Sequence, residues 1–189
     1  MEIRAFAYFF IGRTAKTVST NPKSKNVDKF LGVFWSMNES AIRELTLTSW
    51  AARVWEKELR GVPLQFQEAA LAFCMRQHNE WRQYWNQLAT CGKENTKVVS
   101  MLVHVYNDAA VKLQLDRNDP PEINSLYQVL RGRGITDMDA LHTIAFVLQE
   151  QTWQAKTNGG PFDMNAYVDR VRTCVQTLVE NPRLVRTSK

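Results

Sequence analysis

The sequence lacks the short motifs that usually reveal a catalytic or cofactor-binding protein. It contains no phosphate-binding glycine loop, no dinucleotide fingerprint, no nucleophile elbow and no zinc-protease helix motif. Its three cysteines, Cys74, Cys91 and Cys174, stand far apart and make neither a CxxC pair nor a disulfide framework. No apolar run approaches the roughly 20 residues that span a bilayer. These absences favour a protein that is not an enzyme, has no membrane span and works in a reducing compartment.

Glycine and proline are also scarce, at eight and six in 189 residues, and most of them separate stretches of helical apolar periodicity. No such stretch alternates with a period of two, so strands are not expected between residues 40 and 180. With 44% hydrophobic and 23% charged residues, the chain can bury a core of its own. The periodicity predicts helices over 27–37, 40–60, 65–89, 96–115, 121–131, 137–155 and 164–180.

We therefore predict an all-α fold, with a single helical bundle of about six helices over residues 40–180. An N-terminal extension, 1–39, precedes the bundle, and a basic C-terminal tail, 181–189, follows it. Local signals support these limits: Pro121 suits a first helical turn, and Thr136 and Asp163 are typical helix caps.

The two ends of the chain are basic, whereas the middle is nearly neutral. Residues 1–26 carry five basic and one acidic residue, 182–189 carry three basic residues, and 27–181 carry 16 basic and 18 acidic residues. Basic ends attract anionic partners such as nucleic acid, although they also occur on soluble proteins without such a partner. The candidate partner-binding residues are Arg4, Phe9, Phe10, Arg13, Lys16, Lys23 and Lys25.

This charge distribution favours a non-enzymatic helical interaction protein, a subunit or accessory factor of a larger protein assembly. That interpretation needs no cofactor. We expect a cytoplasmic location. The first 26 residues are poor in acids and contain Ser, Thr and Arg, which is typical of a mitochondrial presequence, so the matrix of a eukaryotic host is the alternative.

The three histidines fall on three different predicted helices. His78 lies in 65–89, His104 in 96–115 and His142 in 137–155. Asp108 follows His104 by four residues, a spacing that places both side chains on one helical face. Asp139 and Glu150 stand one turn before and two turns after His142.

Three interpretations of the histidines remain open. They are hydrogen-bonded polar groups of the core, or ligands of a metal ion, or acid–base residues. The metal interpretation uses His78, His104, Asp108 and His142, and such a mixed nitrogen and oxygen set suits Zn, Fe or Mn. No nucleophile or oxyanion feature accompanies the histidines, which disfavours catalysis.

The order of several motifs between residues 50 and 175 is similar to that of the bacterial family catalogued as domain of unknown function 1841. In that family a Trp-containing helix leads to a Gly-x-Pro-Leu turn, and a helix that ends in a His-Pro-Glu-type motif follows. The matching residues in the first half are Trp50, Val54-Trp55-Glu56-Lys57, Gly61-Val62-Pro63-Leu64, Glu68 and His78-Asn79-Glu80. Those further on are His104, Gln114-Leu115, Asp119-Pro120-Pro121, Ile123, His142, Leu148, Glu150, Trp153, Ala155, Pro161, Asp163, Ala166-Tyr167 and Arg170-Val171-Arg172.

The resemblance implies no activity, because none is known for the family. The family tends to place histidines in pairs four residues apart, and the partner positions here read Arg82, Asp108 and Met138. Only Asp108 can replace a histidine as a metal ligand. The resemblance therefore implies that any metal site of the family is altered or lost in this chain. Residues 1–45 lie outside it.

Overall fold

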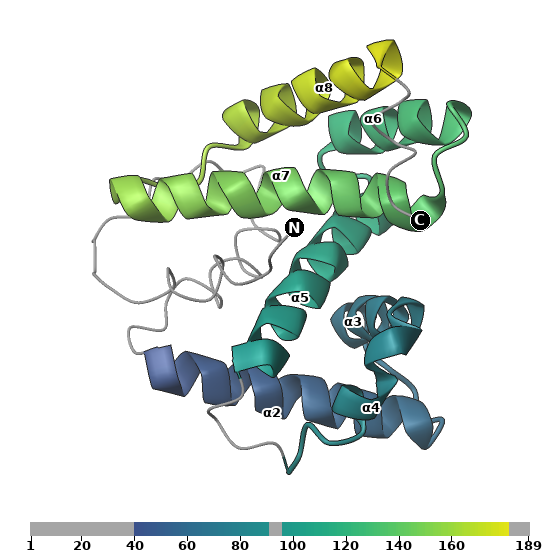
Figure 1. The fold of residues 1–189 in the computed structure, drawn as a ribbon, viewed down its shortest axis with the longest axis vertical. Helices are drawn as coiled ribbons and strands as arrows, with labels where there is room; N and C mark the ends of the chain where they lie inside the picture. Colours follow the sequence, from purple (N-terminus) through teal and green to yellow (C-terminus); the bar gives the residue numbers. More distant parts are fainter. Residues whose placement is uncertain (1–39, 91–95, 182–189) are drawn as a thin grey trace. The chain divides into compact units, whose positions relative to one another are not determined.

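The computed structural model describes residues 40–90 and 96–181, and for 40–46 and 96 it describes the backbone alone (Figure 1). Within these ranges the chain forms seven α-helices and one 3₁₀ helix and no strand, so the predicted all-α fold is confirmed. The predicted helix 27–37, the N-terminal partner-binding candidates and the C-terminal tail from residue 182 lie outside the described residues.

The chain divides into two compact units, one that extends to Ala109 and one that begins at Ala110. The prediction of one bundle domain over residues 40–180 stays a prediction, and each unit is described by itself. The boundary falls inside the long helix α5 (Thr96–Arg117). The first unit contains α2 (Ser40–Leu59), α3 (Phe66–Gln77), the 3₁₀ helix η3 (Asn79–Trp81), α4 (Arg82–Trp85) and the beginning of α5.

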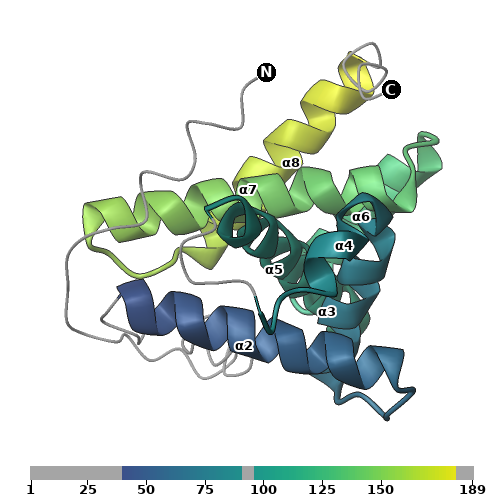
Figure 2. The same cartoon turned by 60° about the horizontal axis from the view of Figure 1, so that its bottom comes forward.

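Helix α2 packs against α3, and both views of the ribbon show these two helices side by side (Figures 1 and 2). The two helices are joined through a turn at Gly61, whose φ of +65° is favourable for glycine. Large side chains from several elements are fully buried in this unit: Val54, Leu71, Met75, Trp85 and Val105.

The predicted helix 65–89 is wrong as one continuous element, because the chain leaves the α-helix at His78. That residue has φ −90° and ψ 60°, and the 3₁₀ turn η3 follows it. The departure is stabilised by tertiary contacts, since Trp85 Nε1 donates a hydrogen bond to the carbonyl of Met75 at 3.0 Å. The buried indole thereby satisfies a carbonyl near the end of α3.

The buried face of α3 begins after its first turn, because Phe66, the first residue of the helix, is 49% exposed. Leu71 and Met75 are fully buried, and His78 at the end of the helix is 5% exposed. The three residues follow helical spacing and so lie on one side of α3.

The second unit contains the end of α5, α6 (Pro121–Gly132), α7 (Asp137–Asn158) and α8 (Met164–Glu180). Helices α6, α7 and α8 all pack against one another (Figure 2). Tyr167 of α8 donates a hydrogen bond to Gln114 of α5 at 2.9 Å, and both side chains are buried. The unit's fully buried side chains include Val111, Ile123, Leu130, Ile144, Leu148, Tyr167 and Val171.

The predicted helix starts in this unit are confirmed. Pro121 is the first residue of α6, and the side chains of Thr136 and Asp163 accept backbone hydrogen bonds as N-caps of α7 and α8. Helix α7 continues about one turn beyond its predicted end, to Asn158. It stops at Gly159, whose φ of +66° provides the left-handed C-cap.

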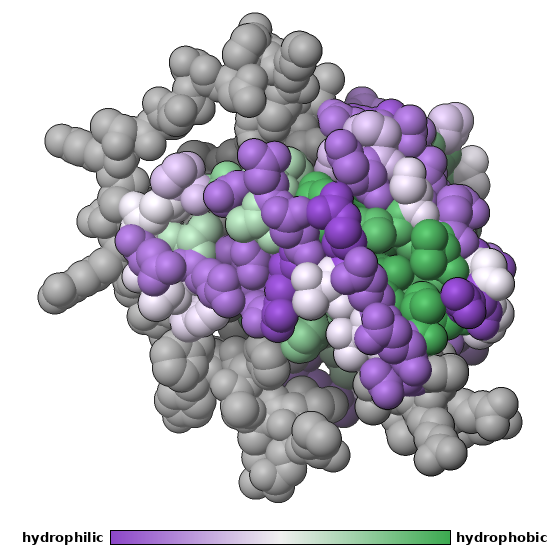
Figure 3. All heavy atoms as spheres, turned by 90° about the horizontal axis from the view of Figure 1, so that it is seen from above, coloured by the Kyte–Doolittle hydropathy of each residue, from purple (hydrophilic) through white to green (hydrophobic). Residues whose placement is uncertain are grey.

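No helix within the described ranges is long and apolar enough to cross a bilayer. Figure 3 shows an apolar area on the face that carries α6 and α8, surrounded by hydrophilic side chains. Val129 of α6 is 46% exposed.

Candidate metal centre

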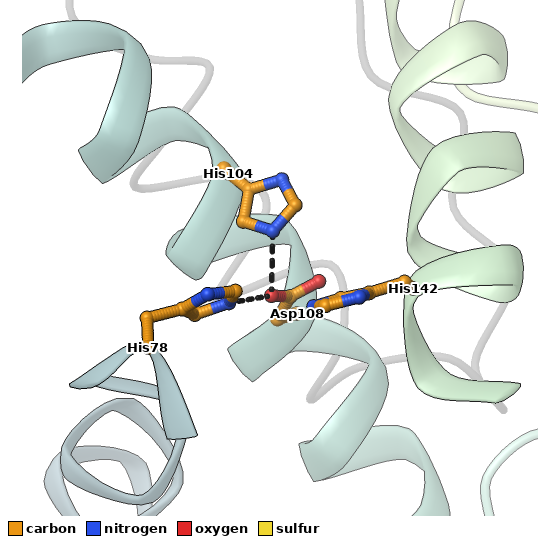
Figure 4. A group of neighbouring side chains, drawn as sticks. All are labelled: His78, His104, Asp108 and His142. Carbon is orange, nitrogen blue, oxygen red and sulfur yellow. Dashed lines mark hydrogen bonds and ion pairs between the residues drawn. The ribbon is translucent and has the colours of Figure 1, made fainter. Parts of the chain in front are cut away.

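Asp108 of α5 is the residue around which the site is built. Its side chain is buried, with 1% of it exposed. Its Oδ2 atom lies 3.1 Å from Nε2 of His78 and 3.3 Å from Nε2 of His104 (Figure 4). A carboxylate removed from water needs compensating positive charge or hydrogen-bond donors, and the two imidazoles supply them.

His104 reaches Asp108 within α5, because the four-residue spacing places both on one helical face. The predicted pairing of these two residues is therefore confirmed by the structure. The side chain of His104 is 40% exposed, whereas those of His78 and Asp108 are 7% and 1% exposed. In this cluster the side chains of His78 and Asp108 are therefore buried, and that of His104 faces solvent.

His78 comes from a different element, the junction between α3 and η3. Both of its ring nitrogens face carboxylates: Nε2 faces Asp108, and Nδ1 lies 3.1 Å from Oε1 of Glu80. An ionised carboxylate can only accept hydrogen bonds, so without a metal ion both nitrogens donate when the ring is an imidazolium. Burial lowers the pKa of His78, but the hydrogen bonds and charges of Asp108 and Glu80 outweigh burial and raise it above its usual value.

Two aromatic contacts hold the imidazoles in place. The indole of Trp81 stacks on the ring of His78, with centroids 4.5 Å apart and an interplanar angle of 11°. The same indole meets His104 edge to face at 5.3 Å. The ring centroids of His78 and His104 lie 4.8 Å apart. This spacing is short enough for both rings to bind one ion.

The fourth predicted ligand, His142, lies on α7 of the second unit and is half-buried (Figure 4). The two acidic residues near it in the sequence have other partners. Asp139 accepts a hydrogen bond from the hydroxyl of Thr136 at the start of α7, at 2.6 Å. Glu150 pairs with Arg170 of α8, at 3.4 Å.

Sequence reasoning missed Glu80 and Trp81 as members of this cluster. Residues two apart on an α-helix do not face each other, so the helical prediction for 65–89 directed Glu80 away from His78. The available signal was Asn79, a residue that favours caps and turns over helix interiors. A helix end at His78 would have placed the following residues beside the imidazole.

The arrangement has two chemical uses. In the first, protonated histidines form ion pairs with the buried carboxylate of Asp108. In the second, the imidazole nitrogens and the carboxylate oxygen bind a metal ion, and the protons that they share are released. One ligand atom from each of His78, His104 and Asp108 lies within 4.8 Å of the others. Imidazole nitrogen and carboxylate oxygen together suit zinc, iron and manganese.

The fold and the cluster define an all-α protein with buried histidine and carboxylate groups at the core of its first unit. Residues 42–173 match the family described as a domain of unknown function, DUF1841. The chain therefore belongs to the DUF1841 family, as its motif order predicted. Comparisons with curated proteins and with solved structures returned no match.

Proposed function

We propose that this protein binds one divalent transition metal ion through His78, His104 and Asp108, and the sequence-based prediction adds His142 as a candidate fourth ligand. The observation that carries the proposal is the separation of 3.1 and 3.3 Å between the two Nε2 atoms and the shared carboxylate oxygen. Zinc bonds of 2.0–2.1 Å in a tetrahedral site place neighbouring ligand atoms about 3.3 Å apart. The two measured separations are therefore those expected between neighbouring ligands of one shared ion.

The burial of Asp108 also supports the proposal. A buried carboxylate needs a positively charged partner, and a bound divalent cation supplies that charge also at pH values at which the imidazoles are neutral. His142 enters the proposal from the sequence, where it has the residue type and helical setting of a ligand. Three protein ligands leave a position open for water or substrate, whereas four make a closed, structural site.

Elemental analysis of untagged protein from the native source tests the proposal directly. We expect close to one equivalent of zinc, iron or manganese. Less than about a tenth of an equivalent, together with no binding of added Zn²⁺ or Co²⁺, would contradict it. Zn²⁺ and Co²⁺ are added because purification removes weakly held metal. The titration is done at a pH at which the ligands are deprotonated, since metal affinity depends on it.

A variant series then assigns the ligands. His78→Ala and His104→Ala should each abolish tight Co²⁺ binding. His142→Ala should weaken binding if His142 is the fourth ligand and leave it unchanged if water occupies that position. Far-ultraviolet circular dichroism of each variant establishes that the helices remain formed. Full Co²⁺ affinity in the His78 and His104 variants would exclude this site.

We propose in addition that the basic ends bind a larger protein or ribonucleoprotein assembly. The supporting observation is the charge distribution, with net charges of +4 and +3 at the ends against −2 in the middle. The cysteine pattern continues to favour a reducing compartment such as the cytoplasm.

Affinity purification from the native source with mass spectrometry tests this second role. Replacing the five basic residues of segment 1–26 by glutamine should remove the co-purifying partner, because the attraction is electrostatic. The matched control replaces Arg183, Arg186 and Lys189 instead, and it separates the contributions of the two ends. Unchanged co-purification in both variants contradicts the role.

A further inference from the structure

Glu80 lies beside the cluster of His78, His104 and Asp108 but is not one of the proposed metal ligands. Its Oε1 lies 3.1 Å from Nδ1 of His78, while Nε2 of the same ring faces Asp108. The Glu80 side chain is 60% exposed, and that of His78 is 7% exposed. The carboxylate thus approaches a buried imidazole from the solvent side, on the nitrogen that faces away from Asp108.

The break in the helix creates this contact. In a continuous α-helix, residue 80 would lie about 200° around the axis from residue 78 and could not reach it. Here α3 ends at Gln77, and the 3₁₀ turn Asn79–Trp81 folds back beside the imidazole. The same turn brings the Trp81 indole onto the ring face of His78. Two consecutive residues therefore restrain one histidine, one at its edge and one at its face.

We infer that Glu80 is a positioning residue for the proposed metal centre, which fixes His78 in the tautomer that presents Nε2 to the ion. This inference rests on the proposed function. A carboxylate that accepts the Nδ1–H bond leaves the Nε2 lone pair for the metal. Such an outer carboxylate fixes the orientation of a ligand histidine and raises its basicity. Glu80 does not touch the ion in this arrangement.

The stacked indole restrains the remaining freedom of the ring. A 180° flip of the His78 ring would exchange Nδ1 with Cδ2 and Nε2 with Cε1, and the hydrogen bond from Nδ1 to Glu80 opposes that flip. Trp81 holds the plane of the ring by stacking at 4.5 Å and also touches His104 at 5.3 Å. The two contacts together preorganise His78 before any ion arrives, and preorganisation reduces the entropy lost on binding.

Titration with Co²⁺, followed by its visible absorption, tests the inference on the full chain. Glu80→Ala removes the acceptor and should weaken Co²⁺ binding about 10–100-fold, the usual effect of losing an outer carboxylate. Glu80→Gln keeps an acceptor without the charge, so its affinity should lie between those of wild type and Glu80→Ala. Absorption maxima should not move, because the ligands are unchanged. His78→Ala should alter the spectrum itself.

The matched control is Glu56→Ala, in the same unit. The Glu56 side chain is 65% exposed and pairs with Arg60 at 3.2 Å. This variant should bind Co²⁺ with wild-type affinity. Wild-type protein that binds neither Co²⁺ nor Zn²⁺ overturns the proposed function and the inference together. Wild-type binding with an equally tight Glu80→Ala variant overturns the inference alone.

A second measurement reads the tautomer itself. Long-range ¹H–¹⁵N spectra of the zinc-loaded protein should show His78 protonated at Nδ1 and bound to zinc through Nε2. The Glu80→Gln variant, which preserves the size of the side chain, should show a less strongly hydrogen-bonded Nδ1 proton. A zinc bond to Nδ1 of His78 would contradict the assignment, whatever the affinities are.

Discussion

Nε2 of His78 and Oδ2 of Asp108 lie 3.1 Å apart, although 30 residues separate them in the chain. The contact joins the end of one helix to the middle of another and buries a carboxylate against an imidazole. His104, four residues before Asp108, approaches the same oxygen atom. The cluster therefore depends on contacts between the end of α3 and α5. Its metal affinity and the stability of the helices can be measured in separate experiments.

The first prediction concerns the charge of Asp108. Asp108→Asn keeps the size of the side chain but removes the charge that attracts an ion, so Co²⁺ affinity should fall by about 10-fold or more. The control is Asp116→Asn on the same helix, where the carboxylate pairs with Lys112. Isothermal titration calorimetry compares both variants with wild type. Equal affinities in all three proteins would remove Asp108 from the ligand set.

The second prediction concerns the hydrogen bond that joins α5 and α8 in the second unit. Tyr167→Phe deletes the hydroxyl and leaves the buried Gln114 oxygen without its 2.9 Å donor. The free energy of unfolding should fall by about 1–3 kcal/mol, as is usual for an unsatisfied buried polar group. Urea denaturation measures it. Tyr127→Phe, which removes a hydroxyl bonded to the exposed Asp137, should cost less than about 0.5 kcal/mol.

The third prediction concerns acid stability through Glu68. Lys57 Nζ donates to Glu68 Oε1 at 2.6 Å, and the backbone N–H of Gln65 donates to Oε2 at 3.0 Å. The bond from Lys57 is the larger cause, and together they hold the pKa of Glu68 below its ordinary value of 4.5. A lowered folded-state pKa contributes stability that is present above pH 4.5 and is lost as the pH falls through the folded pKa.

Urea denaturation between pH 7 and pH 3 checks this linkage. Glu68→Gln should be less stable than wild type at pH 7, and the difference should shrink as the pH falls below 4.5. Glu180→Gln, at the exposed end of α8, is the control for removing a carboxylate as such. A difference between wild type and Glu68→Gln that grows in acid would reverse the predicted sign.

The fourth prediction concerns the N-cap of α7. The hydroxyl of Thr136 accepts from the backbone N–H of Asp139 at 3.1 Å and donates to its carboxylate at 2.6 Å. Thr136→Ala should therefore lower the free energy of unfolding by about 0.5–2 kcal/mol. Thr173→Ala, at an exposed position within α8, should have a smaller effect. Similar losses at the two sites would show that the cap contributes nothing special.

Helix limits were predictable from the sequence where a capping residue stands at the limit. Thr136 and Asp163 cap helices in the structure as their residue types indicated, because a cap depends on a side chain and the two or three backbone groups next to it. Between residues 77 and 82 the local signal, Asn79, was weaker. There the helix end is stabilised by Trp85, ten residues from Met75, whose indole donates a hydrogen bond to the Met75 carbonyl.

The sequence by itself determined the His104–Asp108 pair, since a four-residue spacing on an α-helix places two side chains together whatever the rest of the fold does. Only the tertiary structure decided that His78 joins the pair and that Glu80 and Trp81 accompany it. Those contacts depend on where α3 ends and on packing between segments far apart in the chain. Differences in helix propensity amount to only a few tenths of a kilocalorie per residue, and packing outweighs them.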